Sequence, residues 1–123
     1  MKIAIIGSRA FSDYEMLSSF LNEFLKNNQI NPGEIVSGGA KGADTLAEKF
    51  ALENNIETVI FNPDWEQFGR NACSARNTQI VEYSDIVFAF WDGKSPGTKD
   101  SITKAEKLGK TVIIKIFSNT KTK

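Results

Sequence analysis

The chain has 123 residues, of which fifteen are basic and fifteen acidic, with no histidine and a single cysteine, Cys73. This length predicts one domain, and the zero net charge gives no support to binding of nucleic acid. The composition excludes Ser-His-Asp triads, histidine-ligated metals, an internal disulfide and a multi-cysteine zinc site. No stretch reaches the ~18 apolar residues of a membrane-spanning helix, so we expect a cytoplasmic protein with no membrane contact, no metal and no cofactor.

Five short apolar runs predict strands. They occupy residues 3–6, 35–36, 56–61, 86–91 and 112–117. Runs this short and this rich in Val, Ile and Phe are typical of strands that are buried on both faces, as in a parallel sheet.

Helical patterns fall between these runs. The first is an apolar stripe over residues 17–25, with Ser12 and Glu15 as a predicted capping box at the start of the helix. A second stripe covers residues 43–51, and residues 72–83 are compatible with a third helix.

A fourth helix is predicted before the last strand. Thr98 is its predicted N-cap and Gly109 its stop, and residues 118–123 form a polar tail. Residues 1–117 therefore predict a single domain of alternating strands and helices, joined by right-handed crossovers. The expected fold class is α/β, a doubly wound parallel five-stranded sheet in the order 3-2-1-4-5 with helices on both faces. In such a sheet ligands bind at the carboxyl ends of the strands, where the order reverses.

Three strand-to-helix loops are expected to meet at that edge. They span residues 7–13, 37–44 and 91–100, and each contains glycine, a hydroxyl residue and a cation. Glycine lets backbone N–H groups approach a ligand, and a helix N-terminus attracts negative charge, so the loops predict a site for phosphate or another anion. The candidate ligand-binding residues are Gly7, Ser8, Arg9, Ser37, Gly38, Gly39, Lys41, Gly42, Asp44, Asp92, Gly97 and Thr98. The alternative is that the glycines only form turns.

Residues 63–80, after the third strand, supply further candidates. Trp65 would stack on a base, or else cover the edge of the sheet. Arg76 and Asn77 lie early in a helix, where they would point back toward the pocket mouth or fix the helix start. Cys73 is interpreted as a packing residue, because no histidine is present to activate its thiol. The glycine pattern matches neither a Walker loop nor GxGxxG, so neither triphosphate hydrolysis nor NAD binding is indicated.

Four motifs in this order, GSR, GGAKGAD, DW with a later RN, and DGKSPGT, resemble the SLOG superfamily. The resemblance is to its small stand-alone branch, the YspA/YpsA-related proteins, and it covers about residues 3–114. It implies a Rossmann-like fold that binds a nucleotide or nucleotide-derived ligand, for sensing or sequestration, and a homo-oligomer. Some sensor members recognise ADP-ribose-derived signals, and small free-standing forms occur in phages and other mobile elements.

Two other branches of the superfamily suggest alternative functions. The lonely-guy phosphoribohydrolases cleave nucleotides at the N-glycosidic bond and carry a PGGxGTxxE motif, and here Ser101 stands at the position of its glutamate. An enzyme of this kind would use Asp100, Asp92 or Glu48, whereas our expectation is a binding protein without catalytic residues. DNA-processing protein A binds single-stranded DNA and has a stretch similar to SGGAKGAD, but the neutral chain shows little sign of a basic groove.

Overall fold

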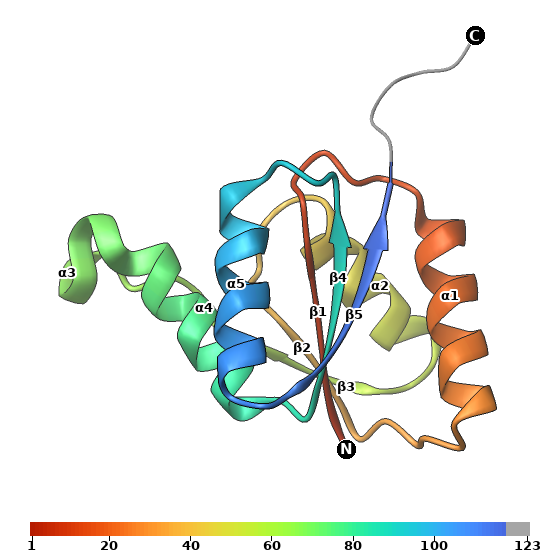
Figure 1. The fold of residues 1–123 in the computed structure, drawn as a ribbon. Coiled ribbons are helices and arrows are strands. Elements are labelled where there is room, and N and C mark those ends of the chain that lie inside the picture. The colour runs from red at the N-terminus through yellow and green to blue at the C-terminus, as the bar shows by residue number, and fades with distance from the viewer. Residues whose placement is uncertain (118–123) are drawn as a thin grey trace, which may run out of the picture.

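The computed structural model describes residues 1–117, and the predicted polar tail at residues 118–123 lies outside the described part. Strands and helices alternate along the described chain (Figure 1). The strands are β1 (Lys2–Gly7), β2 (Glu34–Ser37), β3 (Glu57–Ile60), β4 (Ile86–Trp91) and β5 (Thr111–Ile116). The helices are α1 (Tyr14–Asn27), α2 (Ala43–Glu53), α3 (Trp65–Phe68), the short 3-10 helix η1 (Gly69–Asn71), α4 (Ala72–Tyr83) and α5 (Pro96–Lys107). Within this described part, no helix is long and apolar enough to cross a membrane.

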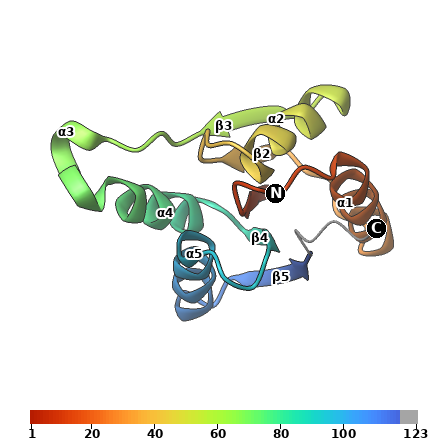
Figure 2. The ribbon, with the colours of Figure 1, turned by 90° about the horizontal axis from the view of Figure 1, so that it is seen from above.

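The five strands form one parallel sheet in the order β3-β2-β1-β4-β5, which confirms the predicted fold class and strand order. Seen from above, the strands form a row with β3 at one end and β5 at the other (Figure 2). Helices α1 and α2 cover one face of the row, and α4 and α5 cover the other. The loops after β1, β2 and β4 therefore gather at one edge of the sheet, which we call the carboxyl edge.

Side chains alternate along β4, so this central strand contributes to a hydrophobic core on each face of the sheet. Phe88 and Phe90 face α1, where the ring of Phe24 stands edge-on to that of Phe88 with centroids 5.1 Å apart. Val87 and Ala89 face α4 and α5. These four side chains are all buried, so the prediction of strands buried on both faces is confirmed for the centre of the sheet.

That prediction is wrong for the two edge strands. Ile60 of β3 is exposed, and so are Ile114 and Ile116 of β5. An edge strand has a neighbouring strand on one side only, and the helices cover it incompletely. Its apolar residues look the same in the sequence as those of a central strand.

The structure corrects two predicted helix caps. Asp13, and not Ser12, caps α1, because its Oδ1 accepts a backbone N–H of the first turn at 3.0 Å. Ser95 is the N-cap residue of α5, and Thr98 lies inside the first turn. Gly109 follows the end of α5 with a φ of +73°, which confirms it as the predicted stop.

The segment between β3 and α4 contains two short elements that apolar periodicity does not predict. Helix α3 begins after Asp64, whose Oδ1 accepts the backbone N–H of Gln67 at 3.1 Å. Helix α3 stands away from the sheet in both views (Figures 1 and 2). A helix of a single turn is too short to carry an apolar stripe, so periodicity could not predict it.

Candidate functional site

Two hollows open at the carboxyl edge and share a wall. The smaller cavity has a volume of about 130 Å³ and lies among β1 and the first turns of α2, α4 and α5. The larger hollow, of about 430 Å³, lies over the loops that follow β1 and β4. Arg9, Gly97 and Thr98 line both. The other lining residues are Ile6, Asp44, Cys73, Arg76, Asn77, Ile80 and Ser101 in the smaller cavity, and Ala10, Asp92, Ser95 and Pro96 in the larger hollow.

Arg76 places a buried positive charge against the smaller cavity. The residue is 9% exposed, and its Nη1 donates to the carbonyl oxygen of Gly38 at 2.7 Å while Nε donates to Asn77 Oδ1 at 3.0 Å. Within residues 1–117, no carboxylate oxygen lies within 4.0 Å of the guanidinium, and Nη2 has no hydrogen-bond partner. Every fully buried side-chain nitrogen or oxygen in this part of the chain has a partner, so Nη2 is not fully buried. A buried cation that no carboxylate contacts directly is costly, and an anion in the cavity would offset that cost.

Asp44, in the first turn of α2, is the acidic group of the same cavity. It is 7% exposed, and its Oδ2 accepts the backbone N–H of Ala40 at 3.1 Å. Burial raises the pKa of Asp44 to about 6, although the Ala40 N–H and the charge of Arg76 act in the opposite direction. Below that pH the acid is largely neutral and the cavity favours an anionic ligand, whereas at neutral pH the carboxylate is largely ionised and offsets part of the charge of Arg76.

The loop between β2 and α2 is tightly packed against its neighbours. A Cβ atom on Gly38 would lie 2.5 Å from a guanidinium nitrogen of Arg76, and one on Gly42 would lie 2.4 Å from the carbonyl oxygen of Ser8. Gly42 also has a φ of +78°, in the region that favours glycine. These two glycines are therefore points where the loop lies in close contact with its neighbours, and their part in binding stays a prediction. Lys41 is exposed and lines neither hollow.

Two more of the predicted glycines also sit at close approaches. A Cβ atom on Gly7 would lie 2.4 Å from the carbonyl oxygen of Phe90, and one on Gly39 would lie 2.7 Å from Asn62 Oδ1. Ser37 ties the same loop together, since its Oγ accepts the N–H of Gly39 at 3.2 Å and donates to a carbonyl of α2 at 3.3 Å. These candidates shape the site from behind, and the lining of the two hollows does not include them.

Asp92 holds the loop between β4 and α5. Its Oδ1 accepts the backbone N–H groups of Ser95 and Lys94, each at 2.8 Å. These bonds, with that from Ser95 the strongest, lower the pKa of Asp92 to about 2, so the carboxylate is ionised at neutral pH. Ser8 connects this loop to the first one, because its Oγ accepts the N–H of Asp92 at 3.2 Å and lies 2.9 Å from Ser95 Oγ.

The N-terminus of α5 faces both hollows with free donors. Gly97 and Thr98 stand where a helix offers no internal acceptor, and no residue of the described part accepts from either backbone N–H. A Cβ atom on Gly97 would meet nothing within 4 Å, so this glycine borders open space. Free N–H groups at a helix start, next to the cationic side chains of Arg9 and Arg76, form a ready site for an anion.

Asn77 and Asp100 connect α4 to α5 behind the smaller cavity. Asn77 Nδ2 donates to Asp100 Oδ2 at 3.2 Å, and the same carboxylate oxygen lies 3.0 Å from Lys104 Nζ. Asp100 lines neither hollow, whereas its neighbour Ser101 is buried in the wall of the smaller cavity. The one-residue step between the two turns their side chains to different sides of α5.

Of the three carboxylates considered for catalysis, only Asp92 lines a hollow, and Glu48 and Asp100 do not. Conversely, Cys73 and Ser101 line the smaller cavity although the sequence analysis did not place them among the site residues. A signal for both was present, because each stands three residues from a predicted site residue on the same helix and so shares its face.

The structure does not bring Trp65 to either hollow. It lies on α3, which stands away from the sheet (Figures 1 and 2), and it is 59% exposed. Its exposed position on α3 does not show it covering the edge of the sheet, and the stacking role stays a prediction.

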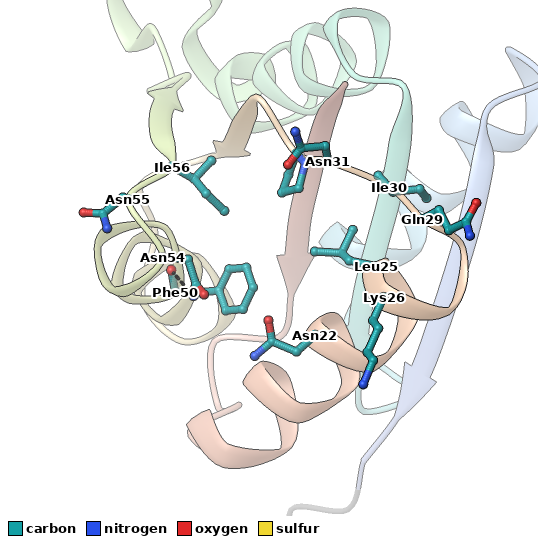
Figure 3. A pocket seen from close by; sticks show the side chains of 11 residues that line it. Asn22, Leu25, Lys26, Gln29, Ile30, Asn31, Phe50, Asn54, Asn55 and Ile56 are labelled. Carbon is teal, nitrogen blue, oxygen red and sulfur yellow. Dashed lines mark hydrogen bonds between the residues drawn. The ribbon is translucent and has the colours of Figure 1, made fainter.

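A third pocket, of about 490 Å³, lies at the end of the sheet away from the carboxyl edge, between the C-terminal ends of α1 and α2 (Figure 3). Leu25, Phe50 and Ile56 point toward one another there, with the carboxamide of Asn22 nearby (Figure 3). None of the predicted site residues lines this pocket. In the described part of the chain, no group of three or more His, Cys, Asp or Glu residues is arranged to hold a metal ion.

Solved structures share this fold. DNA processing protein A from Streptococcus pneumoniae superimposes with a TM-score of 0.72 at 23% identity, over 92% of this chain and 49% of that one. DNA processing protein A from Helicobacter pylori, described for its single-stranded DNA binding mode, gives a TM-score of 0.67 at 26% identity, over 93% of this chain and 64% of that one. This chain therefore corresponds to only part of each of these two proteins.

Sequence comparison gives the family. The Gene 61 protein of Mycobacterium phage D29 is 31% identical over 118 residues, which cover 91% of this chain and 94% of the phage protein. A model of the YspA, cpYpsA-related SLOG family matches residues 1–68. Family model, phage relative and fold agree with the motifs at the carboxyl edge, and the chain belongs to the YspA, cpYpsA-related SLOG family.

Proposed function

We propose that the protein binds a nucleotide or a nucleotide-derived ligand at the carboxyl edge, for sensing or sequestration. The observation that carries this proposal is the Arg76 guanidinium, which is buried against the smaller cavity without a carboxylate within 4.0 Å in the described part of the chain. A phosphate group would supply the counter-charge and accept a hydrogen bond from Nη2. Such charge-assisted bonds are about twice as strong as neutral ones.

The sizes of the two hollows support one orientation of the ligand. The larger hollow, of about 430 Å³, falls in the range of ~300–1,000 Å³ that is usual for small-molecule sites, and the smaller cavity of about 130 Å³ falls below it. In our proposal a phosphate enters the smaller cavity beside Arg76, and the nucleoside part occupies the larger hollow. The N–H groups of Gly97 and Thr98 and the side chain of Arg9 then stand at the junction, where a bridging or second phosphate would lie.

Thermal unfolding in the presence of nucleotides tests the proposal. A ligand that binds only the folded state raises the melting temperature by mass action. We expect such a rise with at least one member of a panel of mono-, di- and cyclic nucleotides and ADP-ribose. We expect Arg76→Met to lose about 1.5–3 kcal/mol of binding free energy, roughly ten- to a hundredfold in affinity, because a charged hydrogen-bonding partner is removed.

Arg70→Met is the matched control for that experiment. Arg70 is an exposed arginine on η1 that lines neither hollow, so its replacement should leave binding unchanged. An equal loss in the two variants would assign the effect to bulk charge. A panel that produces no rise in melting temperature for the wild-type protein would contradict the proposal itself.

Nucleotide N-glycosidase activity is a second candidate function, and the observation in its favour is Asp44. Its carboxyl group lines the smaller cavity, and its pKa of about 6 suits a proton transfer near neutral pH. Asp100, in contrast, is paired with Lys104. Release of free base from nucleoside monophosphates, lost in Asp44→Asn, would establish turnover. Recovery of intact nucleotide after long incubation would support binding alone.

Binding of single-stranded DNA is a third candidate function, suggested by the structural similarity to the DNA processing protein A of Helicobacter pylori. The exposed side chains of Trp65 on α3 and Arg70 on η1 favour it, since such binding combines aromatic stacking with cations along the nucleic-acid backbone. A gel shift of an oligonucleotide at low salt, reduced in Trp65→Ala, would support it, and no shift under those conditions would exclude it.

A further inference from the structure

Strand β5 is an edge strand with little of the usual protection against pairing, since Lys115 is its one charged residue. It has six residues, no proline and one charged residue, and it is the outermost strand of the row in Figure 2. Edge strands of natural proteins are generally short, or carry charges, proline or a bulge, because their unpaired N–H and C=O groups otherwise attract another strand.

The outward backbone groups of β5 belong to its aliphatic residues. Phe117 donates its N–H to the carbonyl of Trp91 on β4 at 3.0 Å, which sets the alternation along the strand. Odd-numbered residues therefore direct their N–H and C=O toward β4, and Val112, Ile114 and Ile116 direct theirs away from the sheet.

The side chains of these three residues lie on one face, the face of α4 and α5. Val112 packs into the core there, while Ile114 is 40% exposed and Ile116 is 55% exposed. On the other face, Lys115 lies over the ring of Phe20, with Nζ 5.5 Å from the ring centroid. Helix α5 thus leaves a strip of aliphatic surface beside backbone groups that no residue of the described part pairs.

The other edge strand of the sheet, β3, is built differently. Strand β3 has four residues, and Glu57 stands on the same face as Val59. Pro63 follows three residues after the strand ends. Short length, a carboxylate and a nearby proline are the protections that β5 lacks.

We propose that β5 pairs with β5 of a second copy of this chain, antiparallel and about a two-fold axis at Ile114. This register sets Ile114 against its own counterpart and Val112 against Ile116 of the second copy. All three face outward, so each opposed pair can exchange backbone hydrogen bonds. The result is one continuous sheet of ten strands with an aliphatic seam on the α5 face, and it does not depend on what the carboxyl edge binds.

The charges of the strand select this register. An axis at Ile114 places Lys115 opposite Ile113, so the two lysines of the pair are kept apart. An axis at Lys115 would oppose like charges and would direct the wrong backbone groups toward the partner. The strand is therefore self-complementary, which points to a second copy of the chain as its occupant.

Sedimentation of the full chain over a range of concentrations tests this pairing. We expect a dimer for the wild-type protein and a monomer for Ile114→Lys, because a lysine on the axis would face another lysine. Ile60→Lys is the matched control, since Ile60 is 42% exposed on β3 and Ile114 is 40% exposed on β5. It should leave the dimer intact. Ile116→Lys, at the more exposed position, serves if Ile114→Lys does not fold.

Cross-linking tests the register itself. In a Cys73→Ser background, Ile114→Cys should give a covalent dimer with a short bismaleimide, and Ile60→Cys should not. A wild-type chain that is monomeric at every concentration would overturn the proposal. So would a dimer that survives both lysine substitutions on β5, or one that cross-links equally through position 60.

Discussion

The loops that follow β2 and β4, the two neighbours of β1, contain the same kinds of residue and pack in opposite ways: each has glycine, serine, lysine and aspartate. The loop after β2 is closed, because Gly38 and Gly42 admit Arg76 and the first loop into contact with its backbone. The loop after β4 is open, and Gly97 borders empty space. The carboxylates of the two loops also differ. Burial raises the pKa of Asp44 in the closed loop to about 6, and backbone N–H groups lower the pKa of Asp92 in the open loop to about 2. Glycine content alone therefore does not identify the surface that meets a ligand.

Gly42→Ala should have the largest effect on stability, because it changes the closed loop after β2. A Cβ atom there meets two carbonyl groups of the first loop and requires a φ of +78°. Backbone strain of this kind costs about 1–3 kcal/mol, and the overlap adds to it, so we expect the free energy of unfolding to fall by about 3 kcal/mol or more. Urea unfolding measures this, and a loss of well under that amount would show that the closed loop has room to relax.

The pH dependence of stability should be the next largest effect. The pKa of Asp44 is about 6 in the folded protein and 3.8 ordinarily, so folding favours the protonated acid. Its contribution to stability is fully present below pH 3.8 and is lost as the pH rises through 6. At 1.36 kcal/mol per pKa unit the loss is about 3 kcal/mol.

Asp44→Asn isolates that contribution. The amide can still accept the N–H of Ala40 and does not ionise, so we expect the variant to be more stable than the wild type at pH 7 and equal to it at acidic pH. Chemical unfolding at several pH values measures the difference. Parallel stability curves for the two proteins would contradict the assignment of this pH dependence to Asp44.

Gly97→Ala should have the smallest effect on stability, because it changes the open loop after β4. Its Cβ atom meets nothing within 4 Å, and alanine is the better helix former, so we expect a change of less than about 1 kcal/mol. Ligand binding should weaken, because the methyl group stands at the junction of the two hollows. Gly93→Ala is the matched comparison, since its site is equally open but has a φ of +83°, and it should lose stability without blocking the hollow.

The parts of the fold that the sequence predicted well are those with local or self-contained signals. The run at residues 86–91 and the helix at residues 72–83 coincide with β4 and α4 in the structure. The capping errors at Ser12 and Thr98 arose because several polar residues precede each helix, and only the backbone path decides which of them reaches an N–H group. The exposure of β5 was missed because edge and centre strands share the same composition.

Several of the predicted site residues do come together in the structure, although their part in binding stays a prediction. Arg9, Asp44, Arg76 and Thr98 come from four separate segments, and the strand order was enough to bring them to one cavity. Lys41 was included with equal reason but is exposed outside both hollows. The place of a loop in the order of strands and helices determines the edge of the sheet at which it lies. The direction of its side chains depends on how the loop packs, which the order of elements does not determine.

The order of elements, the parallel sheet and the edge where the loops meet could be predicted from the sequence alone, because apolar periodicity and crossover handedness are properties of consecutive residues. The folded structure was needed to show which glycines contact their neighbours and which border open space, and that Arg76 lies buried without a carboxylate within 4.0 Å in the described part of the chain. Those features depend on contacts between residues that are distant in the chain, and their energies arise from burial and desolvation, which no local pattern records.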